Sequence, residues 1–237
     1  MMRPIIIALD FQNQQIVMDF LNQFDHPETL FVKVGMELFY FEGPAIVKKL
    51  RQMGVKVFLD LKLYDIPHTV EKAMEQLGRL DVQMTTIHAS GGSAMIQAAK
   101  RGLVKGSQQV NGQPAKLLAV TQLTSTSEHQ MQEEQLVDVS LTESVTHLAK
   151  LAAANGADGT ISSALETPLI HQAAGDAFLC INPGIRLQSN STDDQKRVTT
   201  PAQARELGSN GIVVGRTITQ AKDPQAAYQI VKQEWEG

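Results

Sequence analysis

Short runs of apolar residues, rich in Ile, Val and Leu, alternate along the whole chain with longer segments whose apolar residues recur every three or four positions. The first pattern predicts buried strands and the second amphipathic helices, because side chains repeat with period 2 in a strand and 3.6 in a helix. Their regular alternation is typical of βαβ units and a parallel sheet. Since no Ser-, Gly- or Pro-rich linker divides the chain, we expect one domain over residues 1–237.

Eight strands are predicted, and a helical segment follows each of them. The strands are placed at 5–10, 30–34, 55–61, 84–88, 116–121, 159–162, 178–181 and 211–214. Capping-box sequences at Ser140 and Ser163, and the Pro that follows Thr200, mark three of the helix starts. Eight strand–helix pairs predict an α/β fold, the (β/α)8 TIM barrel. The alternative is a doubly wound open sheet, but no G-x-G-x-x-G follows the first strand.

The third strand ends in charged residues. Asp60 and Lys62 are two positions apart, so strand alternation points both side chains to one face, and Asp65 follows at once. An ion pair at the surface of the strand end is the plainer interpretation of such a set, because charges are costly to bury unless paired. Pro67 and Thr69 come next, and we expect Thr69 to cap the following helix.

Polar residues also stand at the ends of other predicted strands. In a TIM barrel the carboxyl ends of the strands meet at one face, where the reactive groups lie. The residues expected at this face are Asp10, Lys33, Asp60, Lys62, His88, Thr121 and Thr124. We interpret His88 as a hydrogen-bonded histidine at the barrel mouth rather than as a base. The sequence therefore predicts a single pocket that collects these side chains.

The loops after the last two strands fit a phosphate group. Gly215 and Arg216 follow the eighth strand and Arg186 the seventh, in the pair of loops that commonly hold phosphate in this fold. Backbone N–H groups and a guanidinium can both donate to phosphate oxygens. The polar segment 183–199 has the size of a lid or binding loop, and Gln195 lies near its tip. A tight turn and a solvated arginine are the plainer interpretations of Gly215 and Arg216.

Composition and charge narrow the classes of function. A net charge of −4 and a pI near 5.9 argue against binding to nucleic acid or an anionic membrane through a basic surface. No apolar run reaches membrane length, and Asp10 interrupts the first one too early for a signal peptide, so we expect a cytoplasmic protein. The single cysteine, Cys180, excludes an internal disulfide and a cysteine-based metal cluster, and its apolar surroundings favour a core position.

Taken together, these segments resemble the orotidine 5′-phosphate decarboxylase family of the bacterial type, from the first strand to the last helix. The segments that carry the resemblance are 8–10, 32–35, 60–69, 120–125, 182–186 and 214–216. The resemblance implies decarboxylation of orotidine 5′-monophosphate (OMP) to UMP and CO2, the final step of de novo pyrimidine nucleotide synthesis. It also implies that the reaction needs neither a cofactor nor a metal ion.

The resemblance implies a role for each site residue. Lys62 would donate a proton to C6, the carbon that loses CO2, and Asp60 would hold Lys62 in place. Asp65 would reach into the site of the other subunit of a homodimer and complete a charge network with Lys33. The implied substrate-binding residues are Asp10 and Lys33 at the ribose, Thr124 at the pyrimidine, Arg186, Gln195, Gly215 and Arg216 at the phosphate, and Asp60 and Thr69.

Elementary chemistry agrees with these roles. Loss of CO2 from an sp² ring carbon leaves a localised charge, which a fixed ammonium group such as that of Lys62 can stabilise.

Two alternative functions are considered. One is that of a metal-dependent group of enzymes with a similar third strand, the 3-keto-L-gulonate 6-phosphate decarboxylases and hexulose-phosphate synthases. Those enzymes need an acidic magnesium ligand on the second strand, where Lys33 stands. The other alternative is a barrel that binds a nucleotide without catalysis, and the set of Asp60, Lys62 and Asp65 argues against it.

Overall fold

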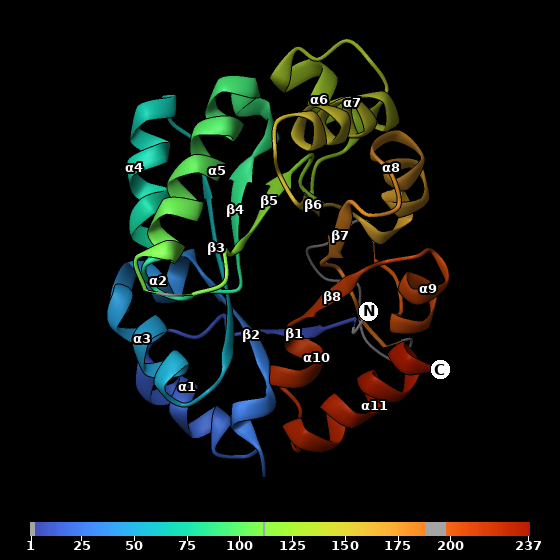
Figure 1. The fold of residues 1–237 in the computed structure, drawn as a ribbon. Helices are drawn as coiled ribbons and strands as arrows, with labels where there is room; N and C mark the ends of the chain where they lie inside the picture. Colours follow the sequence, from blue (N-terminus) through green and yellow to red (C-terminus); the bar gives the residue numbers. More distant parts are fainter. Residues whose placement is uncertain (1–2, 111, 188–197) are drawn as a thin grey trace.

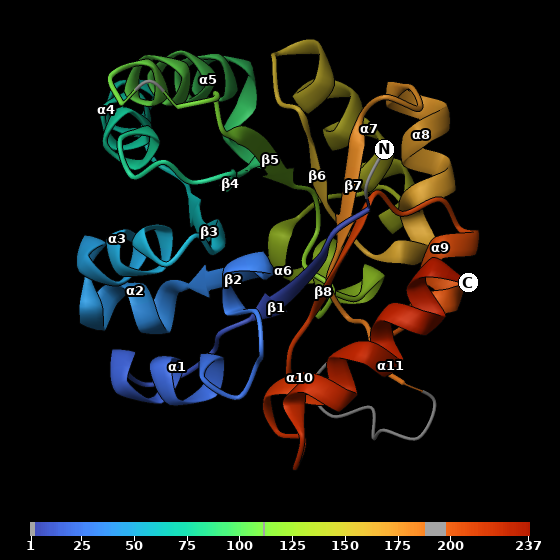
Figure 2. The same cartoon turned by 60° about the horizontal axis from the view of Figure 1, so that its bottom comes forward.

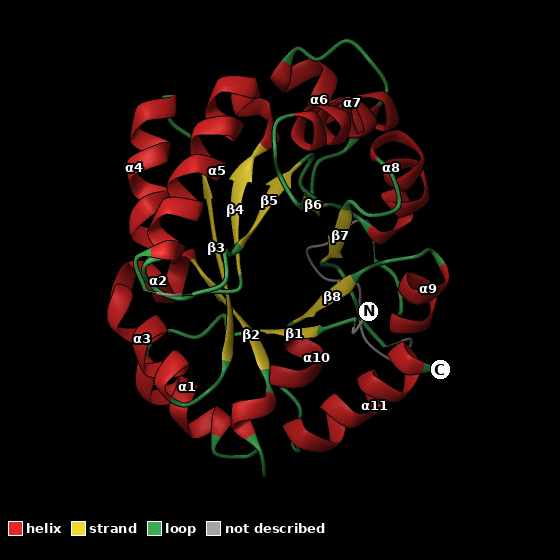
Figure 3. Ribbon diagram, in the orientation of Figure 1, coloured by secondary structure: helices red, strands yellow, loops and turns green. Residues whose placement is uncertain are grey.

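The fold is a closed barrel of eight parallel strands, seen in a computed structural model that describes residues 3–110, 112–187 and 198–237. Each strand pairs with its neighbours in sequence, and β8 pairs with β1 to close the barrel. The helices form a ring outside the strands (Figure 1 and Figure 3). The predicted (β/α)8 fold is confirmed, because every apolar run became a barrel strand.

The strand bounds agree closely with the hydrophobic pattern. The strands are β1 (Ile5–Ala8), β2 (Phe31–Gly35), β3 (Lys56–Leu63), β4 (Met84–His88), β5 (Lys116–Val120), β6 (Gly159–Ile161), β7 (Leu179–Asn182) and β8 (Gly211–Val214). β4 and β8 have the predicted bounds, and the others differ by one or two residues at one or both ends. β3 is the longest strand and carries its charged residues to the barrel mouth.

Helices and short 3-10 turns connect the strands. The helices are α1 (Gln14–Leu21), α2 (Met36–Glu42), α3 (Pro44–Gln52), α4 (Pro67–Gly78), α5 (Gly92–Gln108), α6 (Glu128–Gln135), α7 (Leu141–Ala154), α8 (Thr167–Ala174), α9 (Pro201–Glu206), α10 (Arg216–Thr219) and α11 (Pro224–Glu236), and the 3-10 turns are η1 (Pro27–Thr29), η2 (Ala89–Gly91) and η3 (Ala164–Glu166). The capping boxes predicted at Ser140 and Ser163 are confirmed, and Thr200 is the N-cap of α9, where it also forms a capping box with Gln203. Within the described residues, no helix is long and apolar enough to cross a membrane.

Two expectations about helices were wrong or incomplete. Thr69 does not cap α4, because the helix already begins at Pro67, with Ile66 as the N-cap residue. Proline has a fixed φ and lacks an N–H, so it suits the first helical position and starts the helix two residues earlier. The sequence pattern also did not reveal α2, since its segment Met36–Glu42 is apolar on more than one face and shows no clear helical period.

The apolar core has two layers, one inside the barrel and one between the strands and the helices. The inner layer consists of Ile6, Ala8, Phe58, Met84, Leu118, Val120, Ile161, Ile181 and Val213. Cys180 belongs to the outer layer, as expected for a core cysteine, and burial raises the pKa of its thiol to about 11. Because the inner layer fills the barrel, a pocket can form only at an end of the strands.

The helices that follow the third and fourth strands pack most closely. α4 and α5 lie side by side (Figure 1), and a Cβ atom at Gly102 or Gly106 of α5 would overlap the backbone of Glu71 or Glu75 of α4. At the other side of the barrel, α10 lies against β1 (Figure 2). That contact brings the loop after the last strand next to the end of the first strand, where Asp10 stands.

Candidate active site

A cavity of about 540 Å³ opens at the carboxyl ends of the strands. This volume lies within the range that small-molecule ligands occupy. Five of its apolar lining residues also belong to the inner core layer, namely Ala8, Phe58, Val120, Ile161 and Val213. The cavity therefore rests on the filled barrel interior and lies at the face that the sequence predicted.

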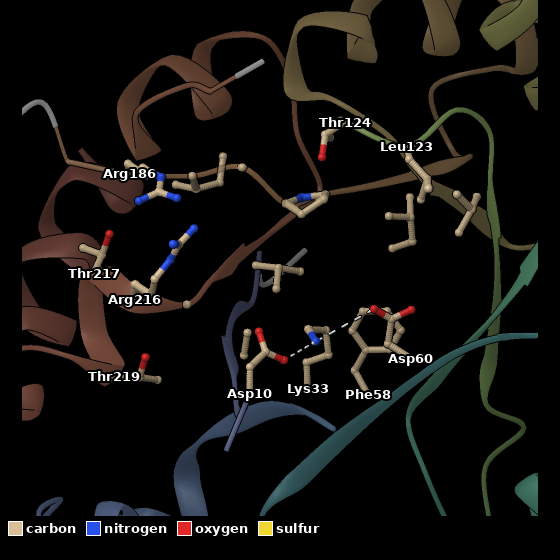
Figure 4. A pocket seen from close by; sticks show the side chains of 18 of the residues that line it. Asp10, Lys33, Phe58, Asp60, Leu123, Thr124, Arg186, Arg216, Thr217 and Thr219 are labelled. Atoms are coloured by element: carbon tan, nitrogen blue, oxygen red, sulfur yellow. Dashed lines mark hydrogen bonds and ion pairs between the residues drawn. The ribbon is translucent and has the colours of Figure 1, made fainter. Parts of the chain in front are cut away.

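Four charged side chains of alternating sign line one side of the cavity. The Lys33 Nζ donates to the Asp10 Oδ1 at 3.0 Å and lies 3.9 Å from the Asp60 Oδ2. The Lys62 Nζ donates to the same Asp60 oxygen at 2.8 Å. Figure 4 shows the row from Asp10 through Lys33 to Asp60. The prediction that Asp60 and Lys62 face the same side is confirmed, and the buried Asp60 carboxylate lies between two ammonium groups.

Two features of the backbone accompany these four charged side chains. Gly35 ends β2, and a Cβ atom there would lie 3.0 Å from the Lys33 Nζ and 3.4 Å from the Asp10 Oδ1. Glycine at this position therefore leaves space for the Lys33 ammonium group. Lys62 has a φ of 51°, a left-handed conformation that is uncommon for a residue with a side chain. Such conformations persist where surrounding contacts impose them, and they concentrate at functional sites.

The opposite side of the cavity is cationic. Arg186 and Arg216 extend their guanidinium groups into it from the loops after β7 and β8 (Figure 4). Gly215 and Thr217 line the same wall, and α10 begins at Arg216. The described charged residues that line the cavity are four cations, Lys33, Lys62, Arg186 and Arg216, and two anions, Asp10 and Asp60. An excess of cations in an enclosed cavity favours an anionic ligand.

The structure brings most of the predicted site residues together. Those that line the cavity are Asp10, Lys33, Asp60, Lys62, Thr124, Arg186, Gly215 and Arg216. Asp65 and Thr69 are exposed and do not line the cavity of their own chain. Gln195 lies outside the described residues.

Two residues expected at the pocket do not reach it. Thr121 and His88 are not among the residues that line the cavity. Burial, with a smaller contribution from the Lys62 charge, lowers the pKa of His88. The ring packs edge-on against Tyr64. The interpretation that His88 is not a base agrees with this position.

Several lining residues were missed by reasoning from the sequence. The polar ones are Gln122, Ser162, Thr217, Thr219 and Gln220. Ser162 follows β6 directly, so its place at a strand end was the available signal. It is fixed by Asn182, whose Nδ2 donates to the Ser162 backbone carbonyl at 2.9 Å and to its Oγ at 3.2 Å. Thr86 was also missed, although it contacts both Asp60 and Lys62.

This geometry defines a class of protein. A closed (β/α)8 barrel with a charged cavity at the carboxyl ends of its strands is the arrangement of a TIM-barrel enzyme that acts on a small anionic molecule. Comparison with known proteins gives the family. The chain belongs to the orotidine 5′-phosphate decarboxylase / HUMPS family, whose family model matches residues 3–231.

Individual relatives are similar over their full length. The chain is 57% identical over 236 residues to an orotidine 5′-phosphate decarboxylase of Latilactobacillus sakei, covering 100% of this chain and 99% of the relative. It is 56% identical over 233 residues to the enzyme of that name from Enterococcus faecalis, covering 98% of each chain. The crystal structure of orotidine 5′-phosphate decarboxylase from Lactobacillus acidophilus matches with a TM-score of 0.90 and 46% identity, covering 100% of both chains.

Proposed function

We propose that the protein decarboxylates OMP to UMP and CO2 without a cofactor or a metal ion. The observation that carries the proposal is the division of the cavity into a side with Asp60 and Lys62 and a side with Arg186 and Arg216. OMP has a carboxylate on its pyrimidine ring and a phosphate on its ribose, so it offers one anionic group to each side. The names of relatives that are 53–57% identical support the same substrate.

Lys62 is the proposed proton donor. When the bond between C6 and the carboxylate breaks, CO2 leaves and the electron pair stays on C6. The Lys62 ammonium group, held by the Asp60 carboxylate at 2.8 Å, stabilises this developing charge and then transfers a proton to C6. UMP is formed, and Lys62 regains its proton from water. Since the ammonium group is positioned before the reaction, little reorganisation is needed when the charge appears.

The remaining side chains bind the substrate in this proposal. Asp10 and Lys33 hydrogen-bond to ribose hydroxyls, and Thr124 binds the pyrimidine edge. Arg186, Gln195, Gly215 and Arg216 bind the phosphate, and Thr69 belongs to the binding set through the resemblance. The phosphate lies far from the reacting carbon, so its binding energy serves to organise the charged side of the cavity. Orotidine without phosphate should therefore react more slowly as well as bind more weakly.

We also propose a homodimer in which Asp65 completes the partner's site. Asp65 is exposed and does not line the cavity of its own chain, and its Oδ1 accepts the N–H of the neighbouring Ile66. Large apolar residues on α2 and in the loop after β3 are strongly exposed, namely Tyr40, Phe41, Tyr64 and Ile66 at 63–74%. Exposed apolar residues of this size mark an interaction surface when they gather on adjacent elements.

A mixing experiment tests the dimer. Asp65→Ala and Lys62→Ala are each expected to be inactive alone, because each lacks one part of every site. After subunit exchange, a mixed dimer has one complete site, so an equal mixture should recover about a quarter of the wild-type activity. Sedimentation of the wild type should show a dimer. A mixture that stays inactive although the subunits exchange would contradict the contribution of Asp65 across the interface.

The metal-dependent members of the wider family are the second candidate. Their chemistry needs an acidic magnesium ligand on the second strand, and here the Lys33 ammonium group lies 3.0 Å from Asp10 and 3.9 Å from Asp60. A cation in that position repels a metal ion that these carboxylates would otherwise attract. This observation favours the metal-independent reaction.

Ultraviolet absorbance tests the proposed function directly. Purified protein is mixed with OMP in EDTA, and the change in absorbance as OMP becomes UMP is followed. The proposal predicts turnover at the same rate with EDTA and with added magnesium. No turnover of OMP would refute the proposed function, and turnover that EDTA abolishes would favour the metal-dependent candidate.

A further inference from the structure

Two adjacent threonines of β4, Thr85 and Thr86, are fully buried but lie in different surroundings. Thr85 is in register with Leu59 and Leu117, which belong to the outer core layer, and Thr86 is in register with Leu118 of the inner layer. Successive side chains of a strand point to opposite faces, so Thr85 faces the helices and Thr86 faces the barrel interior. Within the described part of the chain, the Thr85 hydroxyl has no hydrogen-bond partner.

The Thr86 hydroxyl joins the two residues at the centre of the cavity. Its Oγ1 donates to the Asp60 Oδ1 at 2.9 Å and accepts the backbone N–H of Lys62 at 2.9 Å. The other Asp60 oxygen, Oδ2, accepts from the Lys62 Nζ at 2.8 Å. The three residues therefore form a closed ring of hydrogen bonds that runs through the Lys62 backbone, the Thr86 hydroxyl, the Asp60 carboxylate and the Lys62 ammonium group.

This ring acts where the backbone of β3 is irregular. The pairing of β3 with β4 shifts register between Leu59 and Leu63, and Lys62 lies in the shifted segment with its φ of 51°. A buried backbone N–H needs an acceptor, and the side chain of Thr86 supplies one to Lys62. The same hydroxyl fixes the rotation of the Asp60 carboxylate, so that Oδ2 faces the lysines.

We propose that Thr86 is a positioning residue, whose hydroxyl holds the Lys62 backbone in its left-handed conformation and turns the Asp60 carboxylate toward the Lys62 ammonium group. The inference rests on the proposed function, because it concerns the geometry with which Lys62 meets C6 of OMP. Thr86 contacts Asp60 but does not line the cavity, so it acts through its neighbours and not by contact with the substrate.

Three variants test the role of the hydroxyl. Thr86→Val keeps the shape of the side chain but removes the hydrogen bonds, and Thr86→Ser keeps the hydroxyl and removes a methyl group. Thr85→Val is the matched control, because it removes an equally buried hydroxyl that bonds to nothing in the described residues. For each variant, kcat and KM for OMP, the Kd for UMP and the melting temperature are measured at a temperature where all variants are folded.

The expected results separate positioning from folding. Thr86→Val should lower kcat about 100-fold, since a misplacement on the order of 1 Å in an active site has this effect. Its Kd for UMP should change little, because UMP lacks the carboxylate at C6 and is bound by the other residues of the cavity. Thr86→Ser should restore most of the lost kcat, and Thr85→Val should match the wild type.

Two results would overturn the inference. One is a kcat of Thr86→Val close to those of the wild type and Thr85→Val. The other is a fall in kcat that is equal in Thr86→Ser and Thr86→Val and matches the fraction of protein that no longer binds UMP. That result would show that Thr86 has a structural role only. If the wild type and Thr85→Val both failed to convert OMP, the proposed function itself would be refuted, and the role of Thr86 in it would fall too.

Discussion

Two largely buried aspartates, at opposite ends of the barrel, each hold a pair of lysines. Asp158 stands at the amino end of β6, where its carboxylate accepts from Lys100 and, at 3.2 Å, from Lys116. It also accepts the backbone N–H of Leu117 at 2.8 Å. Asp60 stands toward the carboxyl end of β3 with Lys62 at 2.8 Å and Lys33 at 3.9 Å. The two groups use the same chemistry at the two ends of the same sheet.

The difference between them lies in what remains for a ligand. Asp158 is enclosed by its partners. Burial acts to raise the pKa of its carboxyl group, but the hydrogen bonds from Lys100 and Leu117 and the charges of the lysines outweigh burial, so the pKa is lowered. Asp60 and its lysines instead line a cavity of about 540 Å³. The same kind of ion pair therefore stabilises the fold at the amino end and is open to a substrate at the carboxyl end, the division expected of a TIM barrel.

Of the replacements of Asp60, Arg216 and Asp158, the replacement of Asp60 should lower kcat the most. Asp60→Asn removes the charge that holds Lys62 and Lys33, and loss of a preorganised electrostatic contact lowers kcat by about 10²–10³-fold. The melting temperature should change less than in Asp158→Asn, because water in the cavity can solvate the two lysines. Steady-state kinetics with OMP and thermal unfolding check both parts. A normal kcat in Asp60→Asn would show that the two aspartates do not differ in function.

Replacing Arg216 should affect binding at the other side of the same cavity. Arg216→Ala removes charge-assisted hydrogen bonds worth about 1.5–3 kcal/mol, which predicts a KM for OMP about 10–100-fold higher. Orotidine, which has no phosphate, should react equally with the variant and the wild type. Arg205→Ala is the control, since Arg205 donates to the Glu234 backbone carbonyl outside the cavity. An unchanged KM in Arg216→Ala would remove Arg216 from the phosphate site.

Replacing Asp158 should affect stability and leave catalysis nearly unchanged. Asp158→Asn breaks a largely buried ion pair and should lower the free energy of unfolding by about 2 kcal/mol at pH 7, or roughly 4–8 °C in melting temperature. Because folding lowers this carboxyl pKa, its stabilisation is present above the ordinary value of 3.8 and is lost as the pH falls through the folded value. The difference from wild type should therefore shrink in acid.

Thermal unfolding at several pH values, with kcat measured in parallel, checks this prediction. The exposed Asp176→Asn is the control and should match the wild type at every pH. A large fall in kcat in Asp158→Asn at a temperature where it is folded would contradict the assignment of the amino end to stability.

Much of the fold could be predicted because hydrophobic periodicity survives in almost every element. Each strand lies within a residue or two of its expected bounds, and the capping sequences mark the helix starts. α2 could not be found this way, since its apolar residues are not confined to a buried face and Phe41 is 74% exposed. Thr69 failed as a cap because Pro67 was the stronger start signal.

The candidate site could be predicted where it depends on strand alternation, and not where it depends on contacts between strands. Alternation predicts that Asp60 and Lys62 share a face, and their charged groups do meet at 2.8 Å. The bonds of Thr86 depend on the register shift between β3 and β4, which no pattern within one strand reveals. The cytoplasmic location, the single catalytic domain and the independence from a cofactor stay predictions.

Lys62, at the carboxyl end of the barrel, is the proposed centre of the chemistry on OMP, and Lys62→Ala removes its ammonium group. We expect kcat for OMP to fall by a factor on the order of 10⁴ or more, since the variant lacks both the proton donor and the cation beside C6. The variant should remain folded and still bind UMP, because the groups that bind ribose and phosphate are intact. Substantial turnover of OMP by folded, UMP-binding Lys62→Ala would contradict the account.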